Sequence, residues 1–392
     1  MNAIVLGNGG SGKAAAELLR REGWRVRVLD GDDAWPDGEW NLCVTSPGIP
    51  LMHRWQSAAR DLGIRIVSEL QLGAERYRKI GGRMLAVTGS KGKSSVVKLV
   101  AEALGGIPCG NYGKPLCEVA LDFMERASDE GEKPPVAVVE VSSFQMETTD
   151  LASDAFEAAA ILNLQEDHLD RHGSLEVYHG LKLRLLDFAS VRIRGAEFEE
   201  NGKIGDDISL LAGSYFDNPV LRANGMCAVA LMRVAGLCDD AIRAAFVRFS
   251  ALPHRMQVVG SFNGVTWIDD SKATRISALA AGVSMAKSRF RVRLIAGGQA
   301  KGDSPAMAAA CLSEGVAKVY LIGQCAAEFW KVWGDLVPCE MCGALELAVD
   351  MAKRESEEGD CVLLSPGAAS FDQFKSYGER GDRFAALVRR KP

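Results

Sequence analysis

The stretch Met84-Leu-Ala-Val-Thr-Gly-Ser-Lys-Gly-Lys-Ser-Ser95 decides the fold class of this chain. Met84 to Thr88 is a short apolar run that predicts a buried β-strand, and Val96 to Leu104 has the apolar pattern of a helix. Between them lies a glycine loop, Gly89 to Ser95, with two lysines. A strand, a glycine loop and a helix in this order are typical of a phosphate site in an α/β protein, because backbone N–H groups and the helix N-terminus converge on the anion.

The residues of this loop predict a nucleotide site. Lys93 can neutralise phosphate charge, and a hydroxyl group from Ser94 or Ser95 can reach Mg²⁺. The spacing GxxGKS is shorter than the usual GxxxxGK, so an ordinary glycine turn is the alternative; the position between strand and helix favours the phosphate site. The residues predicted here to bind ATP are Gly89, Ser90, Lys91, Gly92, Lys93, Ser94 and Ser95.

Strands and helices alternate on both sides of this stretch. Asn2 to Leu6, Gly12 to Glu22 and Arg25 to Leu29 have the pattern of a strand, a helix and a strand, which predicts parallel sheets. Boundaries near Gly81-Gly82 and Leu252-Pro253 predict three α/β domains, at residues 1–82, 83–252 and 253–392. Other expected elements are a polar loop at Ser128 to Pro135, a helix at Asp239 to Phe249, and strands at Val136 to Val139, Val292 to Ala296, Val319 to Ile322 and Cys361 to Leu364.

A second glycine turn, Gly7 to Gly12, follows the first strand, and Asp30 follows the next strand. Taken alone, this pattern is a dinucleotide fingerprint. A domain that ends near residue 82 has room for only about half of a six-stranded dinucleotide fold. We therefore interpret the turn as a site for a nucleotide diphosphate other than NAD.

Composition narrows the class of function. With 392 residues, 47% of them hydrophobic, and a net charge of −5, the chain is typical of a globular protein without a broad positive field for nucleic acid. We find no signal peptide and no apolar run of about 18 residues, so we expect a cytoplasmic monomer that acts on small molecules, with no membrane partner. Ten scattered cysteines predict free thiols, and the CxxC at Cys339 to Cys342 lacks the further ligands of a zinc site.

A series of short motifs, in a fixed order along nearly the whole chain, resembles the Mur ligases, and among them the members that add D-glutamate. Besides the two glycine turns, these motifs are Thr45-Ser-Pro-Gly48, Gly110-Asn111, Glu140-Val-Ser-Ser-Phe-Gln145, Asn163-Leu-Gln-Glu-Asp-His-Leu-Asp170, Lys182, Leu252-Pro-His-Arg255, Asp270-Ser-Lys-Ala-Thr274 and Leu364-Ser-Pro-Gly-Ala-Ala-Ser-Phe-Asp-Gln-Phe374.

The resemblance implies a fold and an activity. It implies an N-terminal Rossmann-like domain for a UDP substrate, a central P-loop domain with a parallel sheet, and a C-terminal Rossmann-like domain for the amino acid. It also implies an ATP-dependent ligase of peptidoglycan precursor synthesis. Its substrates would be UDP-N-acetylmuramoyl-L-alanine and D-glutamate, joined through an acyl phosphate.

The resemblance also implies a metal site. Glu140 at a strand end and His168 would hold Mg²⁺, two ions in all, together with Ser94 and a Lys182 carbamoylated by CO₂. A lone histidine is more often structural, and Mg²⁺ prefers oxygen ligands. As a plain residue, Lys182 could lie on the solvated face of a predicted amphipathic helix, Val177 to Phe188.

The remaining site residues are likewise carried over from the resemblance. Those expected to hold the UDP substrate are Gly10, Ser11, Asp30, Ser46, Asn111, Ser142 and His168. Those expected to hold ATP, besides the glycine loop, are Asn224, His254, Arg255, Asp270 and Lys272. Those expected to hold the amino acid are Thr274, Lys301, Ser370 and Tyr377, of which Ser370 is expected to open a helix; a capping role is the alternative for Ser370 and Thr274.

Several positions depart from the family pattern. Lys91 places an additional cation in the phosphate loop, and Val220-Leu221 replaces an expected His-Asn pair near the adenine. Arg275 replaces an asparagine, Tyr377 stands where phenylalanine is common, and the stretch from Ser190 to Asp217 is short. Three rival functions stay open: a related ligase with another amino acid or a folate substrate, a dinucleotide-dependent oxidoreductase, and an interaction protein without activity.

Overall fold

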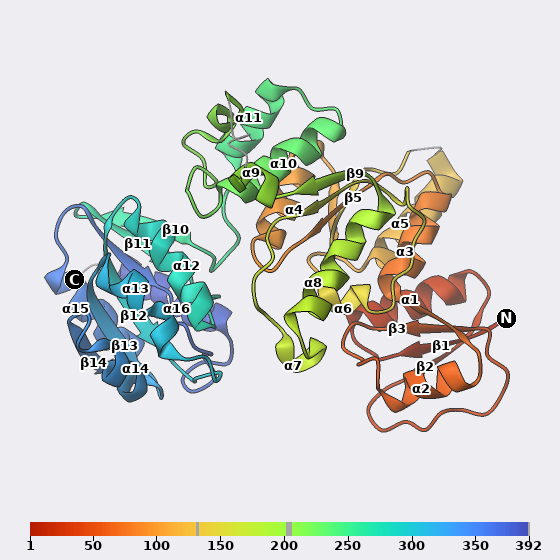
Figure 1. Ribbon diagram of the computed structural model, residues 1–392, viewed down its shortest axis with the longest axis horizontal. Coiled ribbons are helices and arrows are strands. Elements are labelled where there is room, and N and C mark those ends of the chain that lie inside the picture. Colours follow the sequence, from red (N-terminus) through yellow and green to blue (C-terminus); the bar gives the residue numbers. More distant parts are fainter. Residues whose placement is uncertain (131–132, 201–205, 391–392) are drawn as a thin grey trace. The chain divides into compact units, whose positions relative to one another are not determined.

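The computed structural model describes residues 1–130, 133–200 and 206–390 and contains three separate β-sheets flanked by helices (Figure 1). Helices and mostly parallel strands alternate in all three, which confirms the predicted α/β class. In the described part of the chain, no helix is long and apolar enough to cross a membrane.

The first sheet has four parallel strands in the order β2-β1-β3-β4. Its central strands are apolar on both faces, as expected for a parallel sheet covered by helices. The strands are β1 (Asn2–Leu6), β2 (Arg25–Leu29), β3 (Leu42–Thr45) and β4 (Arg65–Ser68), and the helices are α1 (Gly10–Arg21), α2 (Arg54–Asp61) and α3 (Glu69–Lys79).

The second sheet has five parallel strands in the order β6-β7-β5-β8-β9, with the fully buried β5 (Met84–Thr88) at its centre. The glycine loop follows β5, and α4 (Lys93–Leu104) begins three residues before the predicted Val96. The other strands are β6 (Ile107–Gly110), β7 (Ala137–Glu140), β8 (Phe156–Ile161) and β9 (Ala189–Arg194). The other helices are α5 (Leu116–Glu130), α6 (Ser143–Met146), α7 (Leu169–His172), α8 (Leu175–Leu183), η1 (Arg184–Phe188), α9 (Ala196–Glu200), η2 (Asp206–Leu211), α10 (Arg222–Val234) and α11 (Asp239–Arg248).

One predicted loop differs from the structure, and part of the short stretch from Ser190 to Asp217 lies outside the described residues. The polar segment from Ser128 was expected to be a loop, but α5 continues through Glu130, and residues 131–132 lie outside the described part. In the short stretch from Ser190 to Asp217, residues 201–205 also lie outside the described part.

The first two sheets share one hydrophobic core. α3 packs against α5, and the buried apolar residues of both sheets form one continuous cluster, so residues 1–217 and 221–249 make one compact unit. At this junction, burial raises the pKa of Glu69 to about 7, although the Cys117 amide donates to its carboxylate at 2.7 Å. We retain the division of this unit into two domains near Gly81-Gly82 as a proposal.

The third sheet belongs to the second compact unit, which contains residues 250–392 and 218–220. Its strand order is β10-β11-β15-β12-β13-β14, and only β10 is antiparallel to its neighbour. The strands are β10 (Gln257–Phe262), β11 (Val265–Asp269), β12 (Arg291–Gly297), β13 (Val316–Ile322), β14 (Cys339–Gly343) and β15 (Asp360–Leu364). The helices are α12 (Ile276–Lys287), η3 (Pro305–Ala308), α13 (Ala309–Ser313), α14 (Ala326–Trp333), α15 (Leu345–Glu355) and α16 (Tyr377–Arg389).

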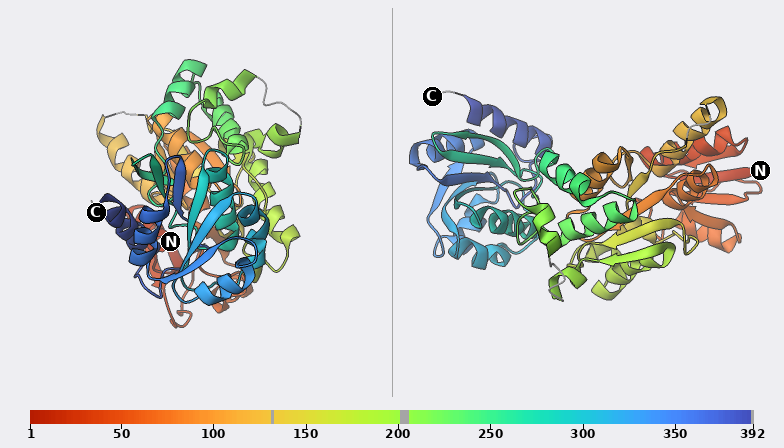
Figure 2. Two further views of the ribbon diagram at one scale, coloured as in Figure 1. Left: turned by 90° about the vertical axis from the view of Figure 1, so that its left-hand side faces the viewer. Right: turned by 90° about the horizontal axis from the view of Figure 1, so that it is seen from above.

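Helices cover both faces of this sheet (Figure 2). Leu294 of β12 packs in the cluster that includes α12 and α14, whereas its neighbour Ile295 packs in the cluster that includes α15 and α16. Because successive side chains of a strand point to opposite faces, β12 is apolar on both sides.

A buried ion pair lies within this sheet. Nε of Arg293 in β12 donates to Oδ2 of Asp360 in β15 at 2.5 Å, and the two side chains are only 8% and 3% exposed. Arg293 also donates to the hydroxyl group of Tyr320 at 3.3 Å. Removing one partner of such a pair leaves the other charge buried and uncompensated.

We therefore expect Arg293→Ala to lower the free energy of unfolding by about 3–5 kcal/mol. The measurement is urea unfolding of the full-length chain. The matched control is Arg383→Ala in α16 of the same unit, where the pair is exposed: Arg383 lies 2.7 Å from Glu346, and the two side chains are 40% and 45% exposed. The control should lower the free energy of unfolding by less than about 1 kcal/mol. Equal losses of unfolding free energy in the two variants would show that burial of the ion pair is not the cause of the destabilisation.

Candidate functional site

The predicted nucleotide residues gather at the carboxyl edge of the five-stranded sheet. The glycine loop follows β5, Glu140 ends β7, Asn111 follows β6 and Asn163 follows β8. Ligands bind at this edge in open parallel sheets. The strand order thus brings together residues that are far apart in the sequence.

The glycine loop is shaped for a phosphate group. Nζ of Lys93 lies over the loop and donates to the carbonyl oxygens of Gly89 at 2.7 Å and Ser90 at 3.2 Å. Gly92 precedes α4 with φ of 85°, and a Cβ atom there would lie 2.3 Å from Nδ2 of Asn224. Because Gly92 offers no side-chain cap, the N-terminus of α4 keeps its N–H groups for an anion.

Glu140 has one carboxylate oxygen without a donor. The side chain is buried, and Nδ2 of Asn111 donates to Oε1 at 2.7 Å. Oε2 is buried and has no hydrogen-bond partner among the described residues. A buried carboxylate oxygen without a partner is costly, and a cation relieves that cost, so Glu140 fits the predicted metal ligand.

Lys182 is buried rather than solvated. Only 2% of the residue is exposed, and Nζ donates to the carbonyl oxygen of Gly89 at 2.9 Å, with the ring of Tyr178 at 4.8 Å. Burial, and then the charge of Lys93, lowers the pKa of Lys182 to about 7. The alternative of a lysine on a solvated helix face is therefore wrong.

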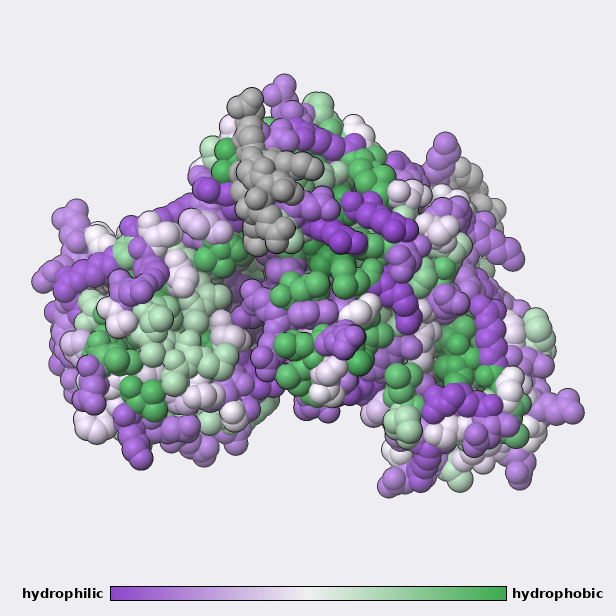
Figure 3. All heavy atoms as spheres, viewed as in Figure 1, coloured by the Kyte–Doolittle hydropathy of each residue, from purple (hydrophilic) through white to green (hydrophobic). Residues whose placement is uncertain are grey.

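The helix that carries Lys182 also differs from the prediction. One helix was expected from Val177 to Phe188, but α8 ends at Leu183 and the 3-10 helix η1 follows. The exposed side of α8 is largely apolar: Leu175, Val177 and Leu183 are exposed beside Glu176, and Figure 3 shows hydrophobic residues over this helix. The helix thus exposes three apolar side chains while its lysine is buried.

His168 precedes α7 in the left-handed backbone region, with φ of 52°. Its ring is 44% exposed, 4.9 Å from the ring of Phe144, and its Nε2 is 3.6 Å from Asp167. In the described part of the chain, no three His, Cys, Asp or Glu side chains form a group that could hold a metal ion. The metal roles of Ser94, Glu140, His168 and Lys182 stay predictions.

Asn163 holds the glycine loop, a role that the sequence analysis missed. Its side-chain amide binds both backbone groups of Lys91: Oδ1 accepts from the N–H group at 2.9 Å, and Nδ2 donates to the carbonyl oxygen at 3.0 Å. Nδ2 also donates to Oδ1 of Asn224 at 3.1 Å. A polar residue directly after the strand beside the loop was the available signal. Asn224 faces this loop, and its predicted role in ATP binding stays a prediction.

The residues predicted for the UDP substrate lie on turns of the first sheet and beside Glu140. Gly10 and Ser11 begin α1, and Ser46 stands 3.5 Å from the carbonyl oxygen of Gly7. A Cβ atom at Gly12 would lie 1.8 Å from that same oxygen, so the turn requires glycine there. Asp30 directly follows β2 and is exposed.

Ser142 caps α6. Its hydroxyl group accepts from the Gln145 amide at 3.3 Å, and the Gln145 side chain accepts from the Ser142 amide at 2.9 Å. This reciprocal pair is a capping box, so the structure gives Ser142 a local role. Its predicted role in substrate binding is untested by this contact.

The second unit carries buried acids at the end of β11. Ser365 donates to Oδ2 of Asp270 at 2.8 Å, and burial raises the pKa of Asp270 to about 7. Nδ1 of His254 lies 2.7 Å from Oδ2 of Asp269, and His254 has φ of 60°. Of the residues predicted to bind ATP, His254 is thus fixed by Asp269, and Asp270 is held by Ser365.

Residues predicted for ATP and for the amino acid lie together in this unit. Nζ of Lys272 stands 4.0 Å from the ring centre of Tyr377, and Nζ of Lys301 donates to the hydroxyl group of Thr274 at 3.3 Å. Burial, followed by nearby cations, lowers the pKa of Lys301. Arg275, the departure beside Thr274, pairs with Asp303 at 2.7 Å. Arg255, also predicted for ATP, follows His254 in the same segment.

Ser370 does not open a helix, which corrects the sequence analysis. It lies in a turn, where the amides of Gln373 and Phe374 donate to its carbonyl oxygen at 3.1 and 2.8 Å. The next helix, α16, begins at Tyr377. Ser370 is therefore a buried turn residue, and the capping alternative is wrong as well.

Arg380 holds this turn and was also missed. It is 1% exposed, and its guanidinium donates to the carbonyl oxygens of Ala368 at 3.1 Å, Ala369 at 3.3 Å and Ser271 at 2.9 Å. Burial lowers its pKa to about 10. Its partners are mostly backbone carbonyl groups, which leave no sequence signal.

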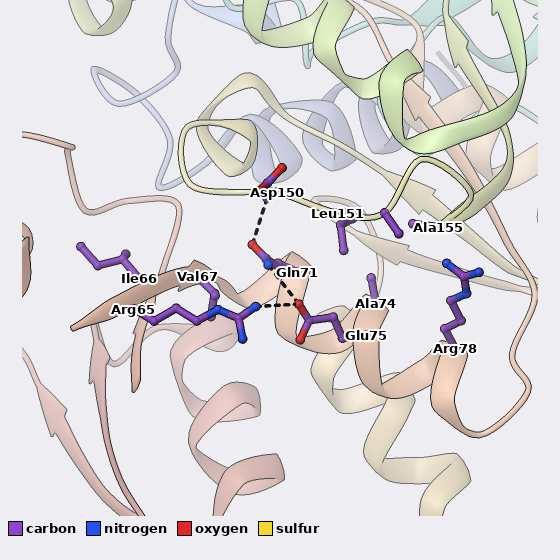
Figure 4. A pocket seen from close by; sticks show the side chains of 11 residues that line it. Arg65, Ile66, Val67, Gln71, Ala74, Glu75, Arg78, Asp150, Leu151 and Ala155 are labelled. Atoms are coloured by element: carbon purple, nitrogen blue, oxygen red, sulfur yellow. Dashed lines mark hydrogen bonds and ion pairs between the residues drawn. The ribbon is translucent and has the colours of Figure 1, made fainter. Parts of the chain in front are cut away.

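A cavity of about 410 Å³ lies apart from these residues, between α3 and the segment after α6 (Figure 4). Gln71 bridges its walls: its side chain donates to Glu75 at 3.0 Å and accepts from the Asp150 amide at 2.9 Å. Arg65 pairs with Glu75 at 3.1 Å. None of the predicted site residues lines this cavity.

Comparisons with known proteins show the family to which the chain belongs. Residues 87–193 match the Mur ligase middle domain, and residues 254–367 match the glutamate ligase domain of the Mur ligases. Two solved structures share the fold: the MurF ligase of Thermotoga maritima in complex with ADP, with a TM-score of 0.58 at 14% identity, and the UDP-N-acetylmuramate-alanine ligase MurC of the same organism, with 0.56 at 16%. Each alignment covers 98% of this chain, with 93% of the MurF chain and 98% of the MurC chain.

Curated relatives are more similar. A protein of Sphingopyxis alaskensis is 34% identical, with 98% of this chain and 96% of the relative covered, and one of Nitratidesulfovibrio vulgaris is 32% identical, with 98% and 95% covered. Both are named UDP-N-acetylmuramoylalanine--D-glutamate ligase. Identity at this level over the whole length places the chain in the Mur ligase family, in the group of its D-glutamate ligases.

Proposed function

We propose that the chain is an ATP-dependent ligase that adds D-glutamate to UDP-N-acetylmuramoyl-L-alanine through an acyl phosphate, a step of peptidoglycan precursor synthesis. The observation that carries this proposal is the group at the carboxyl edge of the five-stranded sheet. A phosphate loop, a buried carboxylate with an orphaned oxygen at Glu140, and the buried amine of Lys182 meet there. A reaction that activates a carboxylate with ATP needs these groups.

The chemistry has two steps. A carboxylate oxygen of the uridine substrate attacks the γ-phosphorus of ATP, and ADP leaves with the electrons of the broken P–O bond. The amine of D-glutamate, after losing a proton, attacks the acyl carbon, and inorganic phosphate leaves. The loop N–H groups and Lys93 hold and neutralise the phosphate oxygens during transfer.

We assign Mg²⁺, as two ions, to Ser94, Glu140, His168 and a carbamoylated Lys182. When bound, Mg²⁺ neutralises charge on the phosphoryl group. The orphaned oxygen of Glu140 supports the assignment. The lowered pKa of Lys182 also supports it, because a much larger share of its amine is neutral near pH 7 than in an ordinary lysine. The neutral amine is the form that reacts with CO₂.

We assign the uridine diphosphate to the turns of the first sheet. The start of α1 offers N–H groups at Gly10 and Ser11, and Ser46 lies on the adjacent turn. Asp30 and Asn111 complete the proposed set, with Ser142 and His168 near the muramoyl end. Helix N-termini are suited to diphosphate groups.

We assign ATP also to Asn224, His254, Arg255, Asp270 and Lys272, and D-glutamate to Thr274, Lys301, Ser370 and Tyr377. The contact between Lys301 and Thr274 supports a carboxylate site, since an ammonium group and a hydroxyl group there can both donate. We further propose that the protein works as a cytoplasmic monomer on small molecules, without nucleic acid or membrane partners.

We expect phosphate release that depends on D-glutamate. Incubation with UDP-N-acetylmuramoyl-L-alanine, ATP and Mg²⁺ should release phosphate with D-glutamate but not with L-glutamate, meso-diaminopimelate or L-alanine. A site that fixes both carboxylates would place the amine at the acyl carbon for only one enantiomer of glutamate. Phosphate assay and product mass check this. Equal turnover with any of the other three would contradict the substrate assignment.

Lys93→Ala should reduce turnover by about 10²-fold or more, because a preorganised cation at the phosphates is lost. Binding of the uridine substrate, measured by calorimetry, should persist, since the residues proposed for its diphosphate lie mostly on turns of the first sheet. The matched variant is Lys91→Asn in the same loop, which should raise the KM for ATP with a smaller loss of rate. Near-normal turnover of Lys93→Ala would mean that this loop is not the ATP site.

Lys182→Ala should reduce turnover far more than substrate affinity, because a carbamate ligand would be lost from the transition state. Added acetate should restore part of the activity in a concentration-dependent way, by supplying carboxylate oxygens in the vacated space. The same acetate series with the wild-type protein is the control. Unchanged turnover of the variant would eliminate this role, and a collapse without rescue would argue against the carbamate.

A further inference from the structure

One arginine ties a turn of the first sheet to the helix beside His168. Arg171, in α7, donates through Nη2 to the carbonyl oxygens of Ile49 at 3.1 Å and Pro47 at 3.4 Å. The turn from Ser46 to Ile49 carries Ser46, a residue of the proposed uridine site. Both ends of this contact lie within the first compact unit.

Arg171 is held rigidly for this contact. Its Nε and Nη2 donate to the two carboxylate oxygens of Glu147 at 2.9 and 2.6 Å, and the two side chains are only 16% and 5% exposed. The ring of Phe144 lies 5.1 Å from the guanidinium. A bidentate pair with little exposure fixes both the plane and the reach of the guanidinium.

The turn itself does not depend on Arg171. Its closing hydrogen bond, from the Ile49 amide to the Ser46 carbonyl oxygen, is 3.0 Å, and the Ser46 amide donates to Leu6 at 3.0 Å. Gln56 also donates to the Ile49 carbonyl oxygen, at 3.2 Å. Arg171 is therefore not needed to form the turn, but it fixes the position of the turn relative to α7.

We propose that Arg171 is a positioning residue that sets the distance between the uridine-diphosphate site and the site of acyl activation. This inference rests on the proposed function, in which one substrate spans from the turn at Ser46 to the groups around His168 and Glu140. In-line attack on ATP needs the substrate carboxylate in place, and a misplacement of about 1 Å can cost 10²-fold in rate. The turn and α7 are joined directly by this guanidinium.

The test compares turnover with binding in Arg171→Ala and Arg171→Lys. Lysine keeps a charge for Glu147 but cannot donate in a fork to the carboxylate and the turn together. We expect kcat to fall about 10-fold to 10²-fold in both variants. The KM for ATP and the dissociation constant of UDP alone should stay within about twofold of the wild-type values. Each of these ligands binds on only one side of the contact between Arg171 and the turn.

The matched control is Arg78→Ala. Arg78 of α3 pairs with Asp154 and so also joins the first sheet to the segment after α6, but at a place with no proposed substrate residue. Its kcat should stay within about twofold of wild type. A second check is Arg171→Ala with added guanidinium, which should recover part of kcat, whereas methylammonium should not.

Several outcomes would overturn the inference. These are an unchanged kcat in Arg171→Lys, an equal loss in Arg78→Ala, or a parallel loss of UDP and ATP binding that points to general unfolding. Failure of the proposed function is distinguishable, because the wild-type protein would then not turn over the uridine substrate at all.

Discussion

The carbonyl oxygen of Gly89 accepts from two lysine amino groups, Lys93 at 2.7 Å and Lys182 at 2.9 Å, and the arrangement of the site depends on this oxygen. Burial disfavours the charged form of Lys182, and the nearby charge of Lys93 disfavours it further, so the pKa of Lys182 falls. The fold must therefore hold both lysines in place. An anion at the loop would stabilise the charged form of both lysines, so this pair of lysines favours phosphate.

The strand order of the five-stranded sheet places the other groups around the glycine loop. With β5 between β7 and β8, the residue that ends β7 and the residue that follows β8 come to either side of the loop. Glu140 and Asn163 occupy these two places. One leaves a carboxylate oxygen without a partner, and the other fixes the backbone of Lys91. A buried carboxylate beside the loop and a fixed loop backbone thus follow from a single feature of topology.

The sequence could predict features that depend on neighbouring residues, but not those that depend on tertiary packing. The glycine loop and the strand end at Glu140 were predictable, because apolar runs and glycines are local signals. The burial of Lys182 was not, since packing buries this lysine while three apolar side chains of α8 stay exposed. The turn at Ser370 was mistaken for a helix start because a serine after an apolar strand has the pattern of an N-cap.

The first compact unit also shows why a domain boundary near Gly81-Gly82 is difficult to predict from sequence. α3 and α5 pack through apolar faces that each look complete as an amphipathic helix, and only the structure shows that they face one another. Periodicity predicts that a helix has a buried face but does not identify its partner. The glycine pair marks a change of sheet, whereas the core continues across it.

Arginines bound to backbone carbonyl groups recur in this chain where turns must be held. Arg171 donates to the turn at Ser46, Arg380 donates to the turn at Ser370, and Arg184 donates to the carbonyl oxygens of Met146 and Thr149. Because every residue has a carbonyl group, such contacts leave the side chains of the turn available for a ligand. The same property hides them from sequence reasoning, since no residue type is required at the acceptor. A turn can thus carry a binding serine while a distant arginine fixes its position, and the two functions can be changed separately.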